Sequence, residues 1–240
     1  MQIRPASGLY FFCFLALALS GFSQHIYLKH PGQDLVKSFS DPKYRVVIIN
    51  PDSNSILEHQ YAYLLNFYPN LLLKTISVKF VKSKHPFKIK PKFSSIFKAP
   101  LQREYRVYYS KTTNSSMDSV LLNNLSFNSQ LGFISIQLSN IEDLSTGGFF
   151  NFLYWYARNW SKKGRRKIYH DAEHRSLELG MGYQLYDYNT EFFQRLQIDN
   201  WQSTKGYSTY MHHYRNLPMK PALILNLISD LPVYMSNAYK

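Results

Sequence analysis

Hydrophobic positions in the first half of the chain follow the patterns of β-strands. One segment, residues 85–93 (HPFKIKPKF), alternates apolar side chains with Lys88, Lys90 and Lys92. This alternation predicts an extended segment with one apolar and one basic face. Short runs of β-branched and aromatic residues predict further strands, at residues 44–50 (YRVVIIN), 76–81 (ISVKFV) and 105–109 (YRVYY).

The second half of the chain has the hydrophobic period of helices. Apolar side chains recur at helical spacing between residues 125 and 145, which predicts a helix there. A strongly aromatic stretch, residues 149–160, predicts a second, largely buried helix, and residues 170–191 predict a third after the basic turn 161–167 (SKKGRRK). A final apolar segment, residues 222–228, follows two prolines. Strands first and helices after indicate an α+β chain.

The beginning of the chain has the features of a secretory signal peptide. A basic residue precedes an apolar run at residues 9–19, and Gly21 and Ser23 hold the small-residue positions before a cleavage site. The run is about half of the roughly 20 apolar residues that a spanning helix needs, so we expect no transmembrane anchor in the mature chain. We predict a signal peptide over residues 1–23 and a single exported domain over residues 24–240.

Composition narrows the class of protein and its compartment. Apolar residues make up 45% and aromatic residues 17% of the chain, which excludes a disordered or collagen-like protein. Cys13 is the only cysteine and lies within the predicted signal peptide, so we expect no disulfide and no thiol nucleophile in the mature chain. An exported protein without disulfides suits the bacterial periplasm, cell surface or extracellular medium better than an animal secretory pathway.

The charge of the chain is positive and unevenly distributed. Lysine and arginine number 28 against 15 aspartate and glutamate residues, a formal net charge of +13. Most of it falls on residues 74–111, where Glu104 is the only acid. This strip either binds an anionic polymer or surface, or is a solvated sheet edge that lysines protect from pairing. Export argues against nucleic acid as the partner. The candidate anion-binding residues are Lys82, Lys84, Lys88, Lys90 and Lys92.

Two segments resemble the zinc-site helices of a known peptidase family. Residues 126–143 (SFNSQLGFISIQLSNIED) resemble the active-site helix of the HExxH zinc metallopeptidases, the zincins, in the setting AQxGxxxHELxHxxD. Residues 170–187 (HDAEHRSLELGMGYQLYD) resemble the helix that supplies the third zinc ligand in the gluzincin branch. The order of the elements between and before them is also similar. The resemblance covers roughly residues 40–190 and implies a zincin-like α+β domain.

The chemical groups of the zinc site are replaced in this chain. Where the resemblance places the first histidine, the glutamate and the second histidine, the chain has Ile136, Gln137 and Asn140. Isoleucine offers no lone pair, and glutamine cannot act as a general base at neutral pH. On the other helix Asp171 and Glu173 remain acidic, whereas Tyr169 lies where an ExxxD pattern would begin. Either the site has degenerated, or residues 125–145 are an ordinary amphipathic core helix.

A second zinc motif lies in the same part of the chain. Residues 170–174 (HDAEH) satisfy the inverted HxxEH pattern, in which His170 and His174 would bind zinc and Glu173 would act as the base. The alternative interpretation is a set of exposed polar residues at the start of a helix, where the helix dipole favours acidic side chains.

The sequence therefore predicts an exported zincin-like protein, a catalytically inactive metallopeptidase homologue that acts by binding an unidentified partner without a cofactor. Two alternatives stay open. One is an active zinc metallopeptidase that uses the HDAEH residues, and the other is an envelope protein that binds an anionic polymer through residues 74–111. The resemblance also implies that Asp171 or Glu173 lies near the three replaced positions of the HExxH motif.

Overall fold

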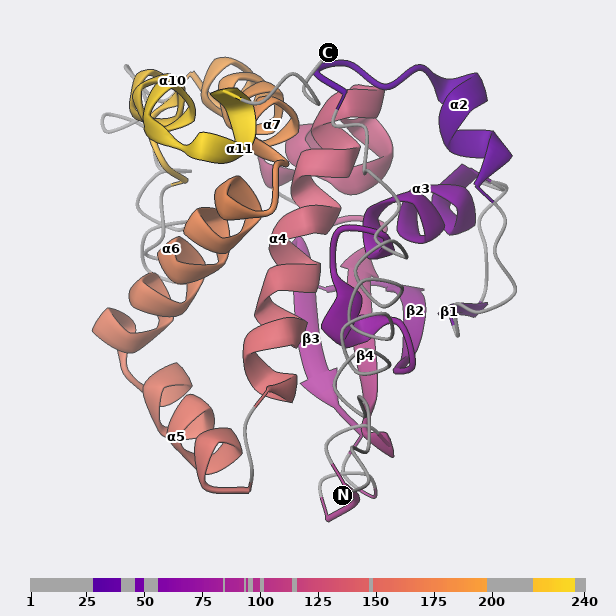
Figure 1. Ribbon diagram of the computed structural model, residues 1–240. Coiled ribbons are helices and arrows are strands. Elements are labelled where there is room, and N and C mark those ends of the chain that lie inside the picture. Colours follow the sequence, from indigo (N-terminus) through magenta and orange to yellow (C-terminus); the bar gives the residue numbers. More distant parts are fainter. Residues whose placement is uncertain are drawn as a thin grey trace, which may run out of the picture.

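A four-stranded sheet and a layer of helices against one of its faces make up the computed structural model (Figure 1). The predicted signal peptide and Lys84 lie outside the residues that the structure describes. Within the described part, no helix combines the length and the apolar character needed to cross a membrane. The described residues are 28–39, 46–49, 56–83, 85–92, 94, 97–99, 102–113, 116–146, 149–197 and 218–235.

The predicted strands are confirmed and belong to one mixed sheet. In the order β1-β2-β4-β3, the first three strands run parallel, and β3 pairs antiparallel with β4 at one margin. Val78 and Val107 lie on the face that is buried beneath the helices, whereas Lys79 and Arg106 lie on the opposite face. The strand bounds are β1 Val46–Ile49, β2 Thr75–Val81, β3 Phe87–Pro91 and β4 Glu104–Ser110.

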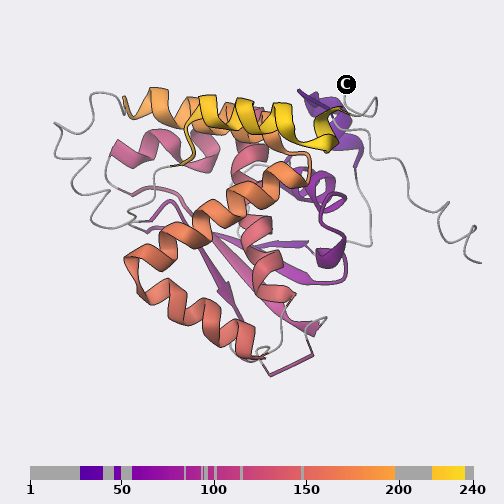
Figure 2. The same cartoon turned by 60° about the vertical axis from the view of Figure 1, so that its left-hand side comes forward.

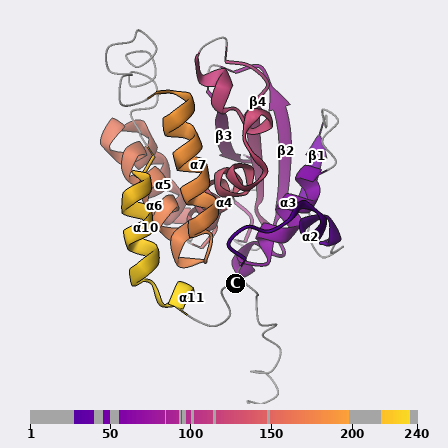
Figure 3. The same cartoon turned by 90° about the horizontal axis from the view of Figure 1, so that it is seen from above.

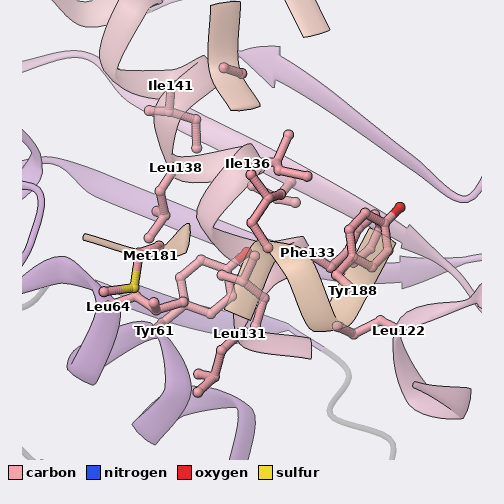
Figure 4. Close-up of a cluster of buried hydrophobic side chains, with 14 of the residues drawn as sticks. Tyr61, Leu64, Leu122, Leu131, Phe133, Ile136, Leu138, Ile141, Met181 and Tyr188 are labelled. Carbon is pink, nitrogen blue, oxygen red and sulfur yellow. The ribbon is translucent and has the colours of Figure 1, made fainter. Parts of the chain in front are cut away.

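Helix α4 (Phe127–Ser145) is the central element and confirms the helix predicted over residues 125–145. The ring centroid of Phe133 lies 5.3 Å from that of Phe87 in β3 and 5.8 Å from that of Tyr109 in β4. Figure 4 shows Phe133 and Ile136 among the buried side chains of this core. Figure 3 shows α3 and α4 on the same side of the sheet.

Helix α3 (Ile56–Leu65) lies between β1 and β2, so the predicted order of strands followed by helices is wrong in this part of the chain. It crosses the sheet between two parallel strands, as such a connection requires. Its side chains are buried on nearly all sides, for example Leu57, Tyr61 and Tyr63. A helix without a polar face has no helical period in its sequence, which explains why the pattern did not reveal it. The α+β class itself is confirmed.

The helix predicted over residues 170–191 is two helices. Helix α6 (Lys162–Glu178) ends before Gly180, which has a φ of 87°, and α7 (Gly182–Arg195) begins after it. A glycine reaches this left-handed backbone conformation without the steric penalty of a side chain. The predicted basic turn is also wrong, because residues 162–167 form the first turns of α6. Ser161 caps them by accepting a hydrogen bond from the Gly164 N–H at 2.9 Å.

Helix α5 (Phe149–Trp160) forms where the aromatic stretch predicted it, but it is not largely buried. Only Phe152 is buried within it, whereas Phe150 is 83% and Trp160 is 81% exposed. Figures 1 and 2 show α5 and α6 joined in a V at the margin of the molecule, beside α4. The remaining helical segments are α2 Gln33–Ser38, η1 Pro69–Leu71, η4 Ser116–Val120, η5 Leu122–Asn124, α10 Pro221–Asp230 and α11 Pro232–Met235.

Candidate ligand pocket at the edge strand

A pocket of about 500 Å³ lies between strand β3 and helices α4, α5 and α6. This volume lies within the range of small-ligand sites, roughly 300–1,000 Å³. Much of its wall is aromatic, and its polar groups come from β3, α4, α5 and the start of α6. The lining residues are Phe87, Lys88, Ile89, Lys90, Asn140, Trp155, Tyr156, Asn159, Trp160, Arg165, Ile168 and Tyr169.

The pocket reaches the free edge of β3. The side chains of Phe87 and Ile89 are partly buried and pack against the core, whereas those of Lys88 and Lys90 are exposed. Because residues of both faces of β3 line the pocket and β4 occupies the other edge of the strand, the pocket extends along the edge that pairs with no strand in the described residues.

The hydrogen-bond pattern shows which backbone groups this edge presents. Ser110 N–H donates to the Pro86 carbonyl and Lys92 N–H to the Glu104 carbonyl, both at 2.8 Å. In an antiparallel ladder, alternate residues direct both backbone groups at the partner strand. The even-numbered residues of β3 therefore face β4. The N–H and C=O groups of Phe87 and Ile89 point away from it, toward the free edge.

Two buried polar atoms at the pocket have no hydrogen-bond partner among the described residues. They are Oδ1 of Asn140 and Nε1 of Trp155. The amide nitrogen of Asn140 donates to the Ile136 carbonyl at 3.0 Å, which fixes the side chain and leaves its oxygen unused. A buried polar atom without a partner costs about 1–3 kcal/mol. One acceptor and one donor thus remain unused in residues that line the pocket.

The three positions that correspond to HExxH have different surroundings. Ile136 and Gln137 are both fully buried, and the Gln137 amide donates to the Phe133 carbonyl at 3.2 Å. Asn140 alone of the three lines the pocket, which Tyr169 of α6 also lines. The structure thus brings together two positions that the resemblance assigns to zinc ligands, the second histidine and the start of the ExxxD pattern.

Asp171 and Glu173 have contacts elsewhere. Asp171 accepts a hydrogen bond from Arg158 of α5 at 2.8 Å and, with His174, lines a second hollow between α4, α5 and α6. Glu173 is fully buried and accepts hydrogen bonds from Asn189 at 3.0 Å and from the Met219 N–H at 2.9 Å. Both acids are therefore engaged by groups that the sequence did not suggest.

The HDAEH residues do not converge on one point. His170 Nδ1 lies 3.0 Å from Glu173 Oε2, while His174 lies at the second hollow. Across the described ranges, no three or more histidine, cysteine, aspartate or glutamate side chains are arranged so that they could hold a metal ion. Asp143 is exposed but lies at the same hollow, where partial desolvation and the nearby carboxylates of Asp171 and Glu142 raise its pKa to about 6.

The fold places the basic residues of the segment 74–111 in different environments, some buried, some in ion pairs and some exposed. Burial, with the positive charge of Arg103 nearby, lowers the pKa of Lys74 to about 8, and both residues are only 3% exposed. Lys92 pairs with Glu104 at 2.7 Å, and this hydrogen bond is the main cause that lowers the pKa of Glu104. Of the predicted anion-binding residues that the structure describes, Lys82, Lys88 and Lys90 are exposed.

The lysines of β3 belong to a face of the sheet that no described helix covers. On this face Lys88 lies opposite Tyr108, and Lys90 lies opposite Arg106. Lys79 of β2 flanks Tyr108 from the other side. In the described part of the chain, these cations on the open face have no ion-pair partner, and like charges directly opposite one another destabilise a sheet.

The pocket lining is what sequence reasoning missed. The aromatic density of residues 149–160 predicts burial, whereas Trp155, Tyr156 and Trp160 form one wall of the pocket.

Comparison of the chain with protein-family models, with curated proteins and with solved structures finds no match.

Proposed function

We propose that this protein is a non-hydrolytic, zincin-like binding protein that holds an extended peptide along the free edge of β3. The observation that carries the proposal is the outward-facing backbone of Phe87 and Ile89 beside the aromatic pocket. An extended peptide that adds to such an edge gains main-chain hydrogen bonds, and its alternate side chains enter pockets.

The groups at the pocket suit binding better than hydrolysis. Asn140 and Trp155 offer a neutral acceptor and a neutral donor, and Lys88, Lys90 and Arg165 add positive charge. Among the described residues that line it, there is no carboxylate, histidine or cysteine to act as a general base, a zinc ligand or a nucleophile. Binding of a peptide with acidic or neutral side chains follows from this set.

A screen of an immobilised library of blocked hexapeptides tests the proposal. Binding peptides should lose affinity when alternate backbone nitrogens are methylated, because only one set of N–H groups faces β3. Ile89→Pro removes a donor that faces the edge and should weaken binding about five- to tenfold, the equivalent of one hydrogen bond of about 1 kcal/mol. The matched variant Lys90→Pro removes a donor that faces β4, so it should destabilise the sheet instead. The proposal would be contradicted if no peptide in the library binds, or if methylation of the peptide backbone leaves the affinity unchanged.

Export is part of the same proposal. The signal-peptide features of residues 1–23 support it. The intact mass of protein recovered from a periplasmic or secreted fraction should correspond to a chain that begins near Gln24. A chain that retains Met1 in that fraction would contradict export by this route.

The open face of the sheet supports a second candidate function, binding of an anionic polymer. Lys90 and Arg106 lie opposite one another there, and an anion between them would relieve their repulsion. Lys88→Gln with Lys90→Gln should lower the salt concentration that elutes the protein from immobilised dextran sulfate. Lys37→Gln with Lys220→Gln removes the same charge from exposed sites elsewhere and serves as the control. Equal elution of both double variants would remove this candidate.

A further inference from the structure

The outward side of α5 is an apolar surface that no described element covers. Phe150, Leu153 and Tyr154 are spaced by three or four residues, and Trp160 follows Leu153 by seven, so they share one side of the helix. The exposed fractions are 83% for Phe150, 45% for Leu153, 63% for Tyr154 and 81% for Trp160. Phe97, itself 77% exposed, stacks on Phe149 with ring centroids 6.1 Å apart and extends the surface.

The inward side of α5 accounts for few of its apolar residues. Phe152 is buried and Trp155 is half-buried there, and Arg158 binds Asp171 of α6. The helix thus has apolar residues on both sides, and the larger set faces outward. Contiguous exposed aromatic groups of this kind mark sites of protein or membrane contact. Figure 2 shows α5 at the outer margin of the molecule.

A dense group of cations follows α5 directly. Positions 162–167 read KKGRRK, and the side chains of Lys162, Lys163, Arg166 and Lys167 are exposed. These four make no ion pair within the described part of the chain. Arg165 instead donates to the carbonyl oxygens of Asn159 at 2.7 Å and Trp160 at 3.3 Å, which joins the end of α5 to the start of α6.

The exposed aromatic side of α5 and the cations that follow it together indicate the kind of partner that this surface binds. Tryptophan and tyrosine concentrate at the level of lipid headgroups, where one end of the ring is apolar and the other is hydrated. Helices that lie in this interface have phenylalanine, leucine or tryptophan on one side and lysine or arginine at their polar boundary. A second copy of the chain would bring another formal charge of +13 to the contact, which opposes self-association.

We propose that α5 and the first turns of α6 form a peripheral membrane-binding element for bilayers that contain anionic lipids. Phe150, Leu153 and Tyr154 enter the headgroup boundary, while Lys162 and Lys163 contact lipid phosphates. The helix lies in the plane of the interface, at a depth of about 5–10 Å for such elements. This inference does not rest on the peptide-binding proposal, since Phe150, Leu153 and Tyr154 do not line the pocket, whereas Trp160 lies at the boundary of the two surfaces.

The test uses Trp160 as a local reporter in the full chain. The chain has 3 tryptophans, so Trp155→Phe with Trp201→Phe leaves Trp160 alone. Vesicles of equimolar phosphatidylcholine and phosphatidylglycerol with brominated acyl chains should quench its fluorescence. Pure phosphatidylcholine vesicles should quench it only at much higher lipid concentration. The readout is confined to α5, so lipid contact by the apolar residues 9–19 does not produce the signal.

Further substitutions in the protein that has Trp160 alone separate the contribution of the apolar side chains from that of the lysines. Phe150→Ser with Leu153→Ser should raise the lipid concentration for half-maximal quenching at least tenfold, since each buried side chain of this size contributes a factor of about ten or more. Lys162→Gln with Lys163→Gln should raise it about 20-fold, from a factor of about five per lysine near an anionic surface. Lys37→Gln with Lys220→Gln, which removes equal charge elsewhere, should change it about twofold or less.

Circular dichroism of the serine and glutamine variants should match that of the parent protein with Trp160 alone, because the side chains that they replace are exposed. Absence of Trp160 quenching on anionic vesicles would overturn the inference. Quenching that the control pair reduces as strongly as the Lys162 and Lys163 pair would also overturn it, because net charge alone would then explain binding. A concentration-dependent dimer that Phe150→Ser abolishes would assign the surface to a second copy of the chain instead.

Discussion

Replacement of the buried carboxylate Glu173 by alanine should destabilise the protein whether or not metal is present. Glu173 is fully buried and accepts hydrogen bonds from Asn189 Nδ2 at 3.0 Å and Met219 N–H at 2.9 Å. Its other oxygen lies 3.0 Å from His170 Nδ1. It thereby joins α6 to α7 and to Met219, two residues before α10.

The expected magnitude follows from the groups that lose a partner. In Glu173→Ala the Met219 N–H is left buried without an acceptor, whereas Asn189 keeps its hydrogen bond to the Met219 carbonyl at 2.9 Å. An orphaned buried donor costs about 1–3 kcal/mol, and loss of the side chain leaves a cavity as well. We expect the free energy of unfolding to fall by about 3–4 kcal/mol. Glu173→Gln keeps one carbonyl oxygen for both donors and should lose about 1 kcal/mol.

Urea denaturation with EDTA and with added zinc measures both variants. The account predicts the same order of stability, wild type above Glu173→Gln above Glu173→Ala, in both conditions. A zinc site at the HDAEH residues would instead make the wild type more stable in zinc, because a ligand that binds the folded state stabilises it. An alanine variant as stable as the wild type, or stabilisation by zinc that His170→Ala and His174→Ala both abolish, would refute the reasoning.

Two further predictions concern packing and charge around α4. Gly132→Ala should lower the free energy of unfolding by about 1–3 kcal/mol despite the better helix propensity of alanine, because a Cβ there would lie 2.1 Å from the Gln184 carbonyl oxygen of α7; unchanged urea midpoints would show that the two helices are not in close contact. Asp143 has a pKa raised to about 6 from a usual 3.8, so its protonated form is favoured by folding and its contribution to stability is lost as the pH rises between these values. Asp143→Asn should therefore stabilise the protein more at pH values above this window than below it. Thermal unfolding measured at a pH on each side of the window checks this, and an equal effect of the substitution at both pH values would show that the carboxyl group is solvated.

The fold was predictable where polar and apolar residues recur at a regular period in the sequence. The alternation in residues 85–93 predicts β3, and the period in residues 125–145 predicts α4, although most of α4 is buried. Helix α3 was not predicted, because its polar residues Glu58, His59 and Gln60 are consecutive and give no helical period. The break at Gly180 was not predicted, because Leu177, Met181 and Leu185 keep a spacing of four residues across it. A spacing between neighbouring turns does not show that one helix ends and another begins in a new direction.

The candidate site was predictable only in part, since its members come from four separate elements. The resemblance singled out Asn140, and the charge pattern singled out Lys88 and Lys90. Neither indicated that these residues line one pocket. Aromatic density in residues 149–160 marks an apolar helix, but it does not say which side of the helix faces the core. The exposed fractions of Phe150 and Trp160 depend on how α5 packs against α6, which is a tertiary property.

Amide hydrogen exchange measured by NMR, with and without a bound hexapeptide, tests the central proposal most directly. The N–H groups of Phe87 and Ile89 face the free edge, whereas those of Lys88 and Lys90 already face β4. The account predicts that saturating peptide slows exchange at Phe87 and Ile89 by about tenfold or more, as a new hydrogen bond does for an exposed amide, with little change at Lys88 and Lys90. Unchanged exchange at Phe87 and Ile89 under saturating peptide would contradict strand addition at β3.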